Sequence, residues 1–85
     1  MSTMVGVPPG ANPHPSLMVL ADRIRDRRLQ LGLSQEDVAE RASLHRTYAS
    51  GLESGRRNPT FVVLLRVARA LEVPASKLIA GISID

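Results

Sequence analysis

The sequence is short and basic, and these properties exclude several classes of protein. Its 85 residues carry a formal net charge of +3 and contain one Phe, one Tyr, no Trp and no Cys. A chain of this length forms a single domain with a small core, the lack of cysteine excludes disulfides and thiolate metal sites, and His14 and His45 are too far apart in sequence to suggest a chelate.

The basic residues are almost all arginine, and no segment is suited to a membrane. Ten of the eleven basic side chains are Arg, which fits an anionic partner, although a GC-rich genome would produce the same bias. No apolar run reaches the roughly 18 residues of a membrane span, and the N-terminus lacks the pattern of a signal peptide. We therefore expect a cytoplasmic protein without a membrane partner.

Residues 1–15 hold four of the six prolines and no charged residue. This composition predicts a disordered tail, followed by one folded domain over residues 16–85. An arm that enters the minor groove of DNA is the alternative, but such arms need Arg or Lys. We assign no role to the tail.

A first helix is predicted from a cap at Ser16 to about Leu31, with Gly32 ending it. Its apolar stripe consists of Leu17, Leu20, Ala21, Ile24 and Leu31. The arginines outside this stripe, Arg23, Arg25 and Arg27, are expected to be solvated.

Arg28 is an anomaly because it falls inside the apolar stripe. A buried guanidinium needs either a route to solvent along its alkyl stem or a carboxylate partner. We predict that Glu53, near the end of the third helix, supplies that carboxylate. The two residues would then form a structural ion pair.

Residues 34–59 encode two short amphipathic helices joined by a tight turn. Ser34 caps the first, with Asp37 reaching back in a capping box, and its buried residues are Val38, Ala39 and Ala42. The turn contains Ser43, in a conformation that favours Gly, and the inward-facing Leu44. The second helix is predicted from about His45 to Ser54. The pattern predicts a helix-turn-helix.

The second helix of this pair has a small and polar outward face. Tyr48, Ala49 and Leu52 lie on its core side, whereas the outward residues are Arg46, Thr47, Ser50, Gly51 and Ser54. A solvated helix would favour Glu, Lys or Gln there, and Gly costs about 1 kcal/mol relative to Ala. An Arg for a guanine edge and a Thr for a thymine methyl or a phosphate suit a helix that enters the major groove. The alternative is a plain helical hairpin in a small bundle.

Two further helices complete an all-α, compact five-helix domain with a central helix-turn-helix. Thr60 caps the fourth, whose expected core stripe is Phe61, Leu64, Leu65, Ala68 and Leu71. Pro74 opens the last, which presents Leu78 and Ile79 and continues to Ile82 and Ile84. These aliphatic residues exceed what one short terminal helix can bury, so we predict a homodimer interface at Leu78, Ile79 and Ile82.

The segments LQLGLSQEDVAERA and LHRTYASGLESGRRNPT resemble the phage-repressor and Cro-like (XRE-type) helix-turn-helix family, and most closely its restriction-modification controller proteins. The resemblance spans about Leu20 to Leu78, although Ser43, Ala49 and Ser54 depart from the usual residues. It implies a five-helix regulator that binds double-stranded DNA as a dimer. It also implies a phosphate contact for Gln35, base-edge contacts for Arg46 and Thr47, and backbone contacts for Ser50, Arg57 and Asn58.

Two more residues join the predicted DNA-binding set. Arg56 belongs to the basic loop before Pro59. His45 is either a phosphate ligand or the cap of the second helix of the helix-turn-helix. The leading hypothesis is a homodimeric regulator acting on a palindromic operator, possibly a controller protein. The alternatives are a phage-type repressor and an antitoxin-like protein-interaction module. No nucleophile-base pair, metal cluster or phosphate loop is visible, so we expect no enzyme, no cofactor and no small-molecule ligand.

Overall fold

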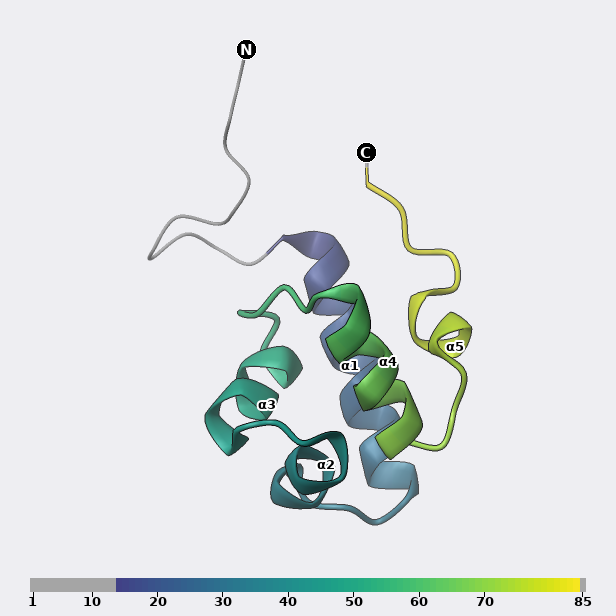
Figure 1. The fold of residues 1–85 in the computed structure, drawn as a ribbon. Coiled ribbons are helices and arrows are strands. Elements are labelled where there is room, and N and C mark those ends of the chain that lie inside the picture. Colours follow the sequence, from purple (N-terminus) through teal and green to yellow (C-terminus); the bar gives the residue numbers. More distant parts are fainter. Residues whose placement is uncertain (1–13, 85) are drawn as a thin grey trace.

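The computed structural model describes residues 14–84, which fold into helices without a strand among them (Figure 1). The helices are α1 (Pro15–Gln30), α2 (Gln35–Ala42), α3 (Arg46–Glu53), α4 (Phe61–Ala70) and α5 (Ala75–Ile79). The predicted all-α, five-helix fold is confirmed. Almost all of the predicted tail lies outside the described residues, and within them no helix is long and apolar enough to cross a bilayer.

Side-chain caps fix the starts of three helices. The predicted capping box of α2 is confirmed: Ser34 Oγ accepts from the Asp37 amide at 3.0 Å, and Asp37 Oδ2 accepts from the Ser34 amide at 2.8 Å. The latter bond is the main cause that lowers the pKa of Asp37. Thr60 caps α4 as predicted. The predicted cap of α1 was wrong, because His14 Nδ1, not Ser16, accepts the amide bond and Pro15 begins the helix.

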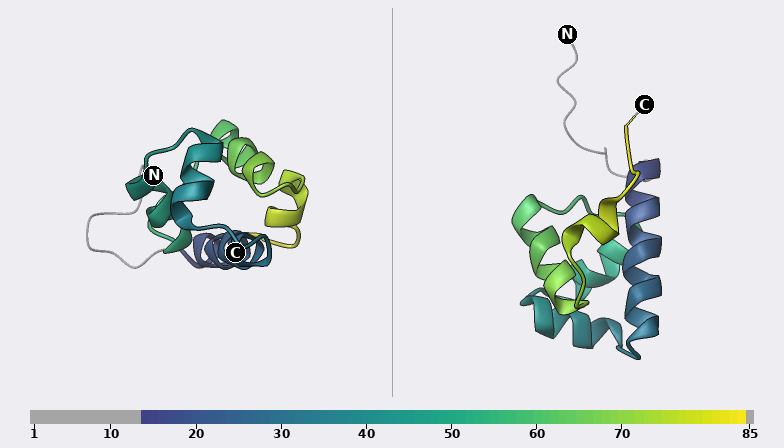
Figure 2. Two further views of the ribbon diagram at one scale, coloured as in Figure 1. Left: turned by 90° about the horizontal axis from the view of Figure 1, so that it is seen from below. Right: turned by 90° about the vertical axis from the view of Figure 1, so that its right-hand side faces the viewer.

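The helices surround one core, with α1 as its longest wall (Figure 2). Viewed along α1, the α2–α3 pair lies on one side of it and α5 on the other, while α4 closes the gap between them. Accordingly, α1 packs on α3 and α5, and α4 packs on α2 and α5. This arrangement leaves one long side of α3 free of other helices.

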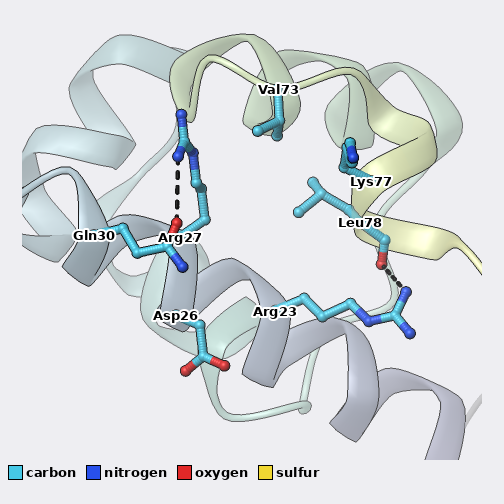
Figure 3. Close-up of a pocket in the computed structure, with 7 residues that line it drawn as sticks. All are labelled: Arg23, Asp26, Arg27, Gln30, Val73, Lys77 and Leu78. Carbon is cyan, nitrogen blue, oxygen red and sulfur yellow. Dashed lines mark hydrogen bonds between the residues drawn. The ribbon is translucent and has the colours of Figure 1, made fainter.

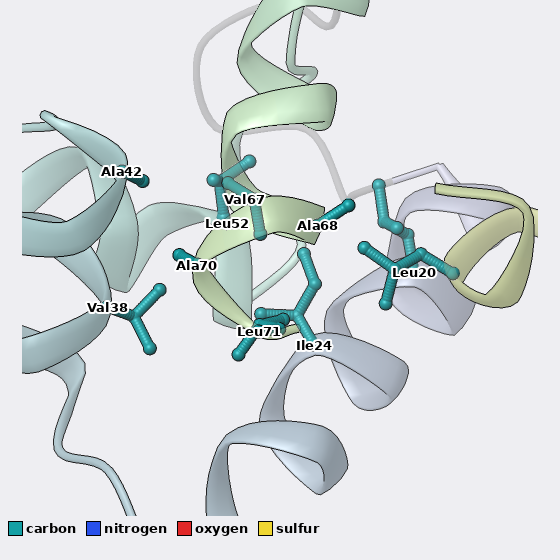
Figure 4. Packing of buried hydrophobic residues seen from close by; sticks show 10 residues of the cluster. Leu20, Ile24, Val38, Ala42, Leu52, Val67, Ala68, Ala70 and Leu71 are labelled. Atoms are coloured by element: carbon teal, nitrogen blue, oxygen red, sulfur yellow. The ribbon is translucent and has the colours of Figure 1, made fainter. Parts of the chain in front are cut away.

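The core is built from aliphatic side chains of all five helices (Figure 4). Its most completely buried large residues are Ile24, Val67, Leu71 and Leu78. Several buried residues of the core region are alanines, whose small side chains allow helices to pack closely. Dense packing of this kind makes the position of each helix depend on its neighbours.

The inward face of α4 differs from the prediction. Phe61 is 71% exposed and Leu65 is also exposed, whereas Val67 and Ala70 are buried. The reason is that the helix faces the core with a different side: Val63 and Leu64 of its first turn pack against the core, whereas Phe61, Val62 and Leu65 lie outside that face. The predicted stripe was therefore correct only for Ala68 and Leu71, with Leu64 half-buried.

Two arginines that were expected to be solvated instead tie α1 to the ends of α4 and α5. Arg27 Nε donates to Leu71 O at 2.9 Å, and Arg23 Nη1 donates to Leu78 O at 3.2 Å. Figure 3 shows both side chains along a groove of about 430 Å³ between α1 and α5. Because carbonyls at helix ends lack intrahelical partners, these arginines satisfy acceptors of the fold. Of the three arginines, only Arg25 is exposed, beside Asp22.

Candidate DNA-binding surface

The turn between α2 and α3 has the predicted tight geometry. Ser43 ends α2 in the left-handed conformation, with φ of 57° and ψ of 46°. The amide of Leu44 then donates to Ala39 O at 2.8 Å, which reverses the chain, and α3 begins at Arg46. Ala39 and Ala49 are both buried, so the two helices approach closely. The helix-turn-helix predicted from the sequence is confirmed.

The outward side of α3 is exposed and shallow. Arg46, Thr47 and Ser50 are exposed, and together with Gln35 of α2 they line a hollow of about 250 Å³. His45 takes the N-cap position of α3, but its side chain makes no capping hydrogen bond, and its contact with a phosphate stays a prediction. Four predicted DNA-contacting residues are thus brought together on one surface.

An ion pair between Arg28 and Glu53 lies beneath this surface, as the sequence predicted. Arg28 Nε and Nη2 donate to Glu53 Oε2 and Oε1 at 2.6 and 2.9 Å, and the side chains are only 13% and 5% exposed. Arg28 Nη1 also donates to Leu33 O at 2.9 Å. The bidentate geometry fixes the last residue of α3 against α1, since two parallel bonds define an orientation as well as a distance.

Gln35 belongs to the same network, which the sequence did not reveal. Its Nε2 donates to Glu53 Oε1 at 3.3 Å. The first residue of α2 and the last residue of α3 are therefore joined through one carboxylate. Sequence spacing gives no signal for this bond, because the two residues meet only after the turn has folded. The network positions the Gln35 side chain beside the hollow on α3.

The basic loop after α3 presents Arg56, Arg57 and Asn58, all of them exposed. Gly55 begins the loop with φ of 76°, as expected for a helix stop. Arg57 does not extend freely into solvent: its Cζ lies 5.3 Å from the centroid of the Tyr48 ring, and its stem covers Gly51. The prediction that Gly51 forms part of an open outward face is therefore corrected.

The residues predicted for a dimer interface have unequal exposure. Leu78 is 2% exposed and belongs to the core of its own chain, so its assignment to the interface was wrong. Ile82 is half-buried against that core, whereas Ile79 is exposed. Phe61, Val62 and Leu65 of α4 are exposed apolar residues that the sequence pattern did not identify. Helical periodicity could not separate them from core positions because they continue the same apolar segment.

Comparisons with known proteins agree with this geometry. The Helix-turn-helix family model matches residues 24–78, which is more than half of the chain. The chain belongs to this family. It is 41% identical over 61 residues to control protein C.SmaI of Serratia marcescens, a match that covers 72% of this chain and 73% of that protein.

Solved structures of controller proteins share both the fold and part of the sequence. The structure of the restriction-modification controller protein C.AhdI from Aeromonas hydrophila matches with a TM-score of 0.75 and 37% identity, covering 76% of this chain and 98% of that one. The C.Esp1396I tetramer in complex with its natural 35 base-pair operator matches with a TM-score of 0.71 and 35% identity, covering 76% and 86%. The predicted resemblance to controller proteins is confirmed.

Proposed function

We propose that this helix-turn-helix protein is a homodimeric, sequence-specific transcription regulator of the controller type, without catalytic activity of its own. The observation that carries the proposal is the exposed side of α3, where Arg46, Thr47 and Ser50 surround a shallow hollow. Its low relief suits the major groove, which admits one α-helix. A protein that regulates transcription in this way acts on the chromosome, so we assign it to the cytoplasm.

The side chains divide into two roles. Arg46 and Thr47, in the first turn of α3, are assigned to base edges. Gln35, His45, Ser50, Arg56, Arg57 and Asn58 are assigned to the phosphate backbone, which positions the protein but carries little sequence information. Within the described residues, Arg46, Arg56 and Arg57 have no carboxylate partner. Their charge is available to an external anion.

Selection of bound duplexes from a random pool tests this function. We expect the selected sites to share a palindromic sequence and to bind more tightly than scrambled duplexes of the same length, with log K falling as log salt rises. Equal affinity for selected and scrambled duplexes would favour the alternative, a protein-interaction module in which DNA contacts are incidental. The variant Arg69→Ala is the control for loss of a positive charge outside the α3 surface, because Arg69 is exposed on α4.

We further propose that the dimer forms through the exposed apolar residues of α4 and α5. Phe61, Val62 and Leu65 on α4 and Ile79 on α5 are exposed, and the two helices pack against each other. A domain of this size gains a substantial fraction of its buried apolar surface when it dimerises. Two copies related by a two-fold axis would present their α3 helices to successive half-sites.

Sedimentation measures the predicted dimer. Ile79→Glu should give monomers at micromolar concentration, because a charge cannot be buried unpaired in an apolar interface. Leu29→Glu is the matched control, since Leu29 is an exposed aliphatic residue of α1. A dimer that persists in both Ile79→Glu and Phe61→Glu would place the interface on another surface.

A further inference from the structure

Gly51 allows the side chain of Arg57 to lie flat on α3. A Cβ built at Gly51 would be 2.6 Å from Arg57 Cγ, 3.3 Å from Nε and 3.5 Å from Cδ. Carbon atoms in contact normally lie about 3.5 to 4.0 Å apart, so no side chain at position 51 is compatible with this position of Arg57. Glycine is otherwise among the least favourable residues inside a helix. The close approach gives its presence in α3 a physical reason.

Tyr48 also contacts the side chain of Arg57. Gly51 and Tyr48 together form a site on α3 that we call the Arg57 seat. Tyr48 precedes Gly51 by three residues, so both lie on one face of α3. The guanidinium carbon of Arg57 is 5.3 Å from the centroid of its ring, within the range of a cation–π interaction. Tyr48 is itself half-buried against the core, so the ring is a fixed platform. The Tyr48 ring therefore contacts the guanidinium group of Arg57, and the absence of a side chain at Gly51 leaves room for its alkyl stem.

The loop backbone adds to this arrangement. The amide of Arg56 donates to Gly51 O at 2.9 Å, and Ser54 Oγ donates to the same carbonyl at 3.0 Å. The residue that accommodates Arg57 thus also anchors the start of its loop. Among the described residues no carboxylate pairs with Arg57. Its side chain lies against α3, yet its charge has no carboxylate partner among these residues.

We infer that Gly51 and Tyr48 are positioning residues that hold the Arg57 guanidinium beside α3, ready to bind a backbone phosphate next to the bases that α3 reads. This inference rests on the proposed DNA-binding function and adds to it the means by which one anchoring contact is arranged before binding. A side chain that is already ordered loses less conformational freedom when the complex forms. The seat therefore increases affinity for all duplexes without selecting among sequences.

Gly51→Ala is the central test, because its effects on DNA binding and on folding should have opposite signs. The added methyl displaces Arg57, so affinity for a selected operator and for a random-sequence duplex should both fall roughly tenfold. The slope of log K against log salt should flatten by about one per protomer. The melting temperature should be unchanged or higher, since Ala favours a helix more than Gly does. Unchanged affinity and slope would overturn the inference.

A double-mutant cycle separates this mechanism from a direct clash between the new methyl group and DNA. In an Arg57→Ala background, Gly51→Ala should have no further effect on affinity, because the side chain that it displaces is gone. A second tenfold loss in that background would show that Gly51 is needed for close approach to DNA, and the inference would fail. This outcome would leave the proposed function intact. That function would be refuted if the wild-type protein bound selected and scrambled duplexes with equal affinity.

Tyr48 variants provide an independent test that does not alter Gly51. Tyr48→Phe keeps the ring and should retain the wild-type salt dependence, whereas Tyr48→Leu removes the π face and should flatten the slope as Gly51→Ala does. Circular dichroism confirms that each variant is folded before binding is measured. Equal losses in the Phe and Leu variants would show that the hydroxyl group, not the ring, matters, and would remove Tyr48 from the seat.

Discussion

Three of the four arginines of α1 and three arginines in or near α3 have the same chemistry and opposite surroundings. Arg23, Arg27 and Arg28 donate to carbonyls or a carboxylate of their own chain. Arg46, Arg56 and Arg57 are exposed and have no carboxylate partner among the described residues. The comparison teaches that net charge is a weak guide to a DNA-binding surface. The location of acceptors within the fold determines which cations remain for DNA.

The largest expected effect comes from breaking the buried pair of α1. Arg28→Met or Glu53→Leu alone should lower the free energy of unfolding by about 3 to 5 kcal/mol, because each strands a buried charge, whereas the double variant should be much closer to wild type. Urea unfolding of all four proteins measures the coupling. Additive losses, with coupling below about 0.5 kcal/mol, would contradict the pair. The exposed pair Asp22–Arg25 is the control and should contribute under about 1 kcal/mol.

An arginine of α3 should behave in the opposite way. Arg46→Ala should leave the free energy of unfolding nearly unchanged, because its side chain is exposed. It should weaken operator binding by about 1 to 3 kcal/mol per half-site and relax the preference at one base pair. Competition between operators that differ at single positions measures this preference. Equal weakening on operator and scrambled DNA would refute a base contact.

Arg27→Ala tests whether an α1 arginine has any part in DNA binding. Loss of its bond to Leu71 O should lower the free energy of unfolding by about 1.5 kcal/mol. The salt dependence of DNA binding should remain that of the wild type. A flattened slope, as expected for Arg57→Ala, would remove the distinction between the two groups of arginines.

The smallest effect concerns an acid in the same helix pair. Hydrogen bonds from Ser34, first from its amide and then from its hydroxyl, and the nearby Arg41 lower the pKa of Asp37 in the folded protein. Its contribution to stability is therefore fully present above about pH 4, the usual range for Asp, and is lost as the pH falls through the lowered pKa. Asp37→Asn should make unfolding less dependent on pH below about 4. Urea titrations between pH 2 and 7 measure the difference, and an unchanged acid dependence would contradict it.

Most of the fold and part of the site could be predicted from the sequence. Caps such as Ser34 and Thr60 are local signals, so the helix starts that they determine were predicted correctly. The Arg28–Glu53 pair was predictable because a charge in an apolar stripe requires a partner. The left-handed Ser43 followed from the tightness of the turn.

The remaining features depend on where helix ends and loops meet in space. Arg23 and Arg27 find carbonyls of distant helices, and such acceptors have no sequence pattern. The seat of Arg57 on Gly51 likewise requires the course of the loop. Phe61 and Leu65 belong to an apolar segment that covers more than one face of α4, so the pattern does not identify the face that packs on the core. His14 replaced Ser16 as the cap because Pro15 already suits the first helical position.

The two attachments of α1 have a mechanical consequence for a dimer on DNA. Arg23 holds the end of α5 and Arg28 holds the end of α3, and these residues are about 7.5 Å apart along a rigid helix. In the proposed dimer, α1 therefore links α5, which faces the partner, to α3, which faces the major groove. In that dimer, α1 would contribute, together with the packing of α2, α4 and α5, to the distance between the two α3 helices and so to the spacing of the half-sites.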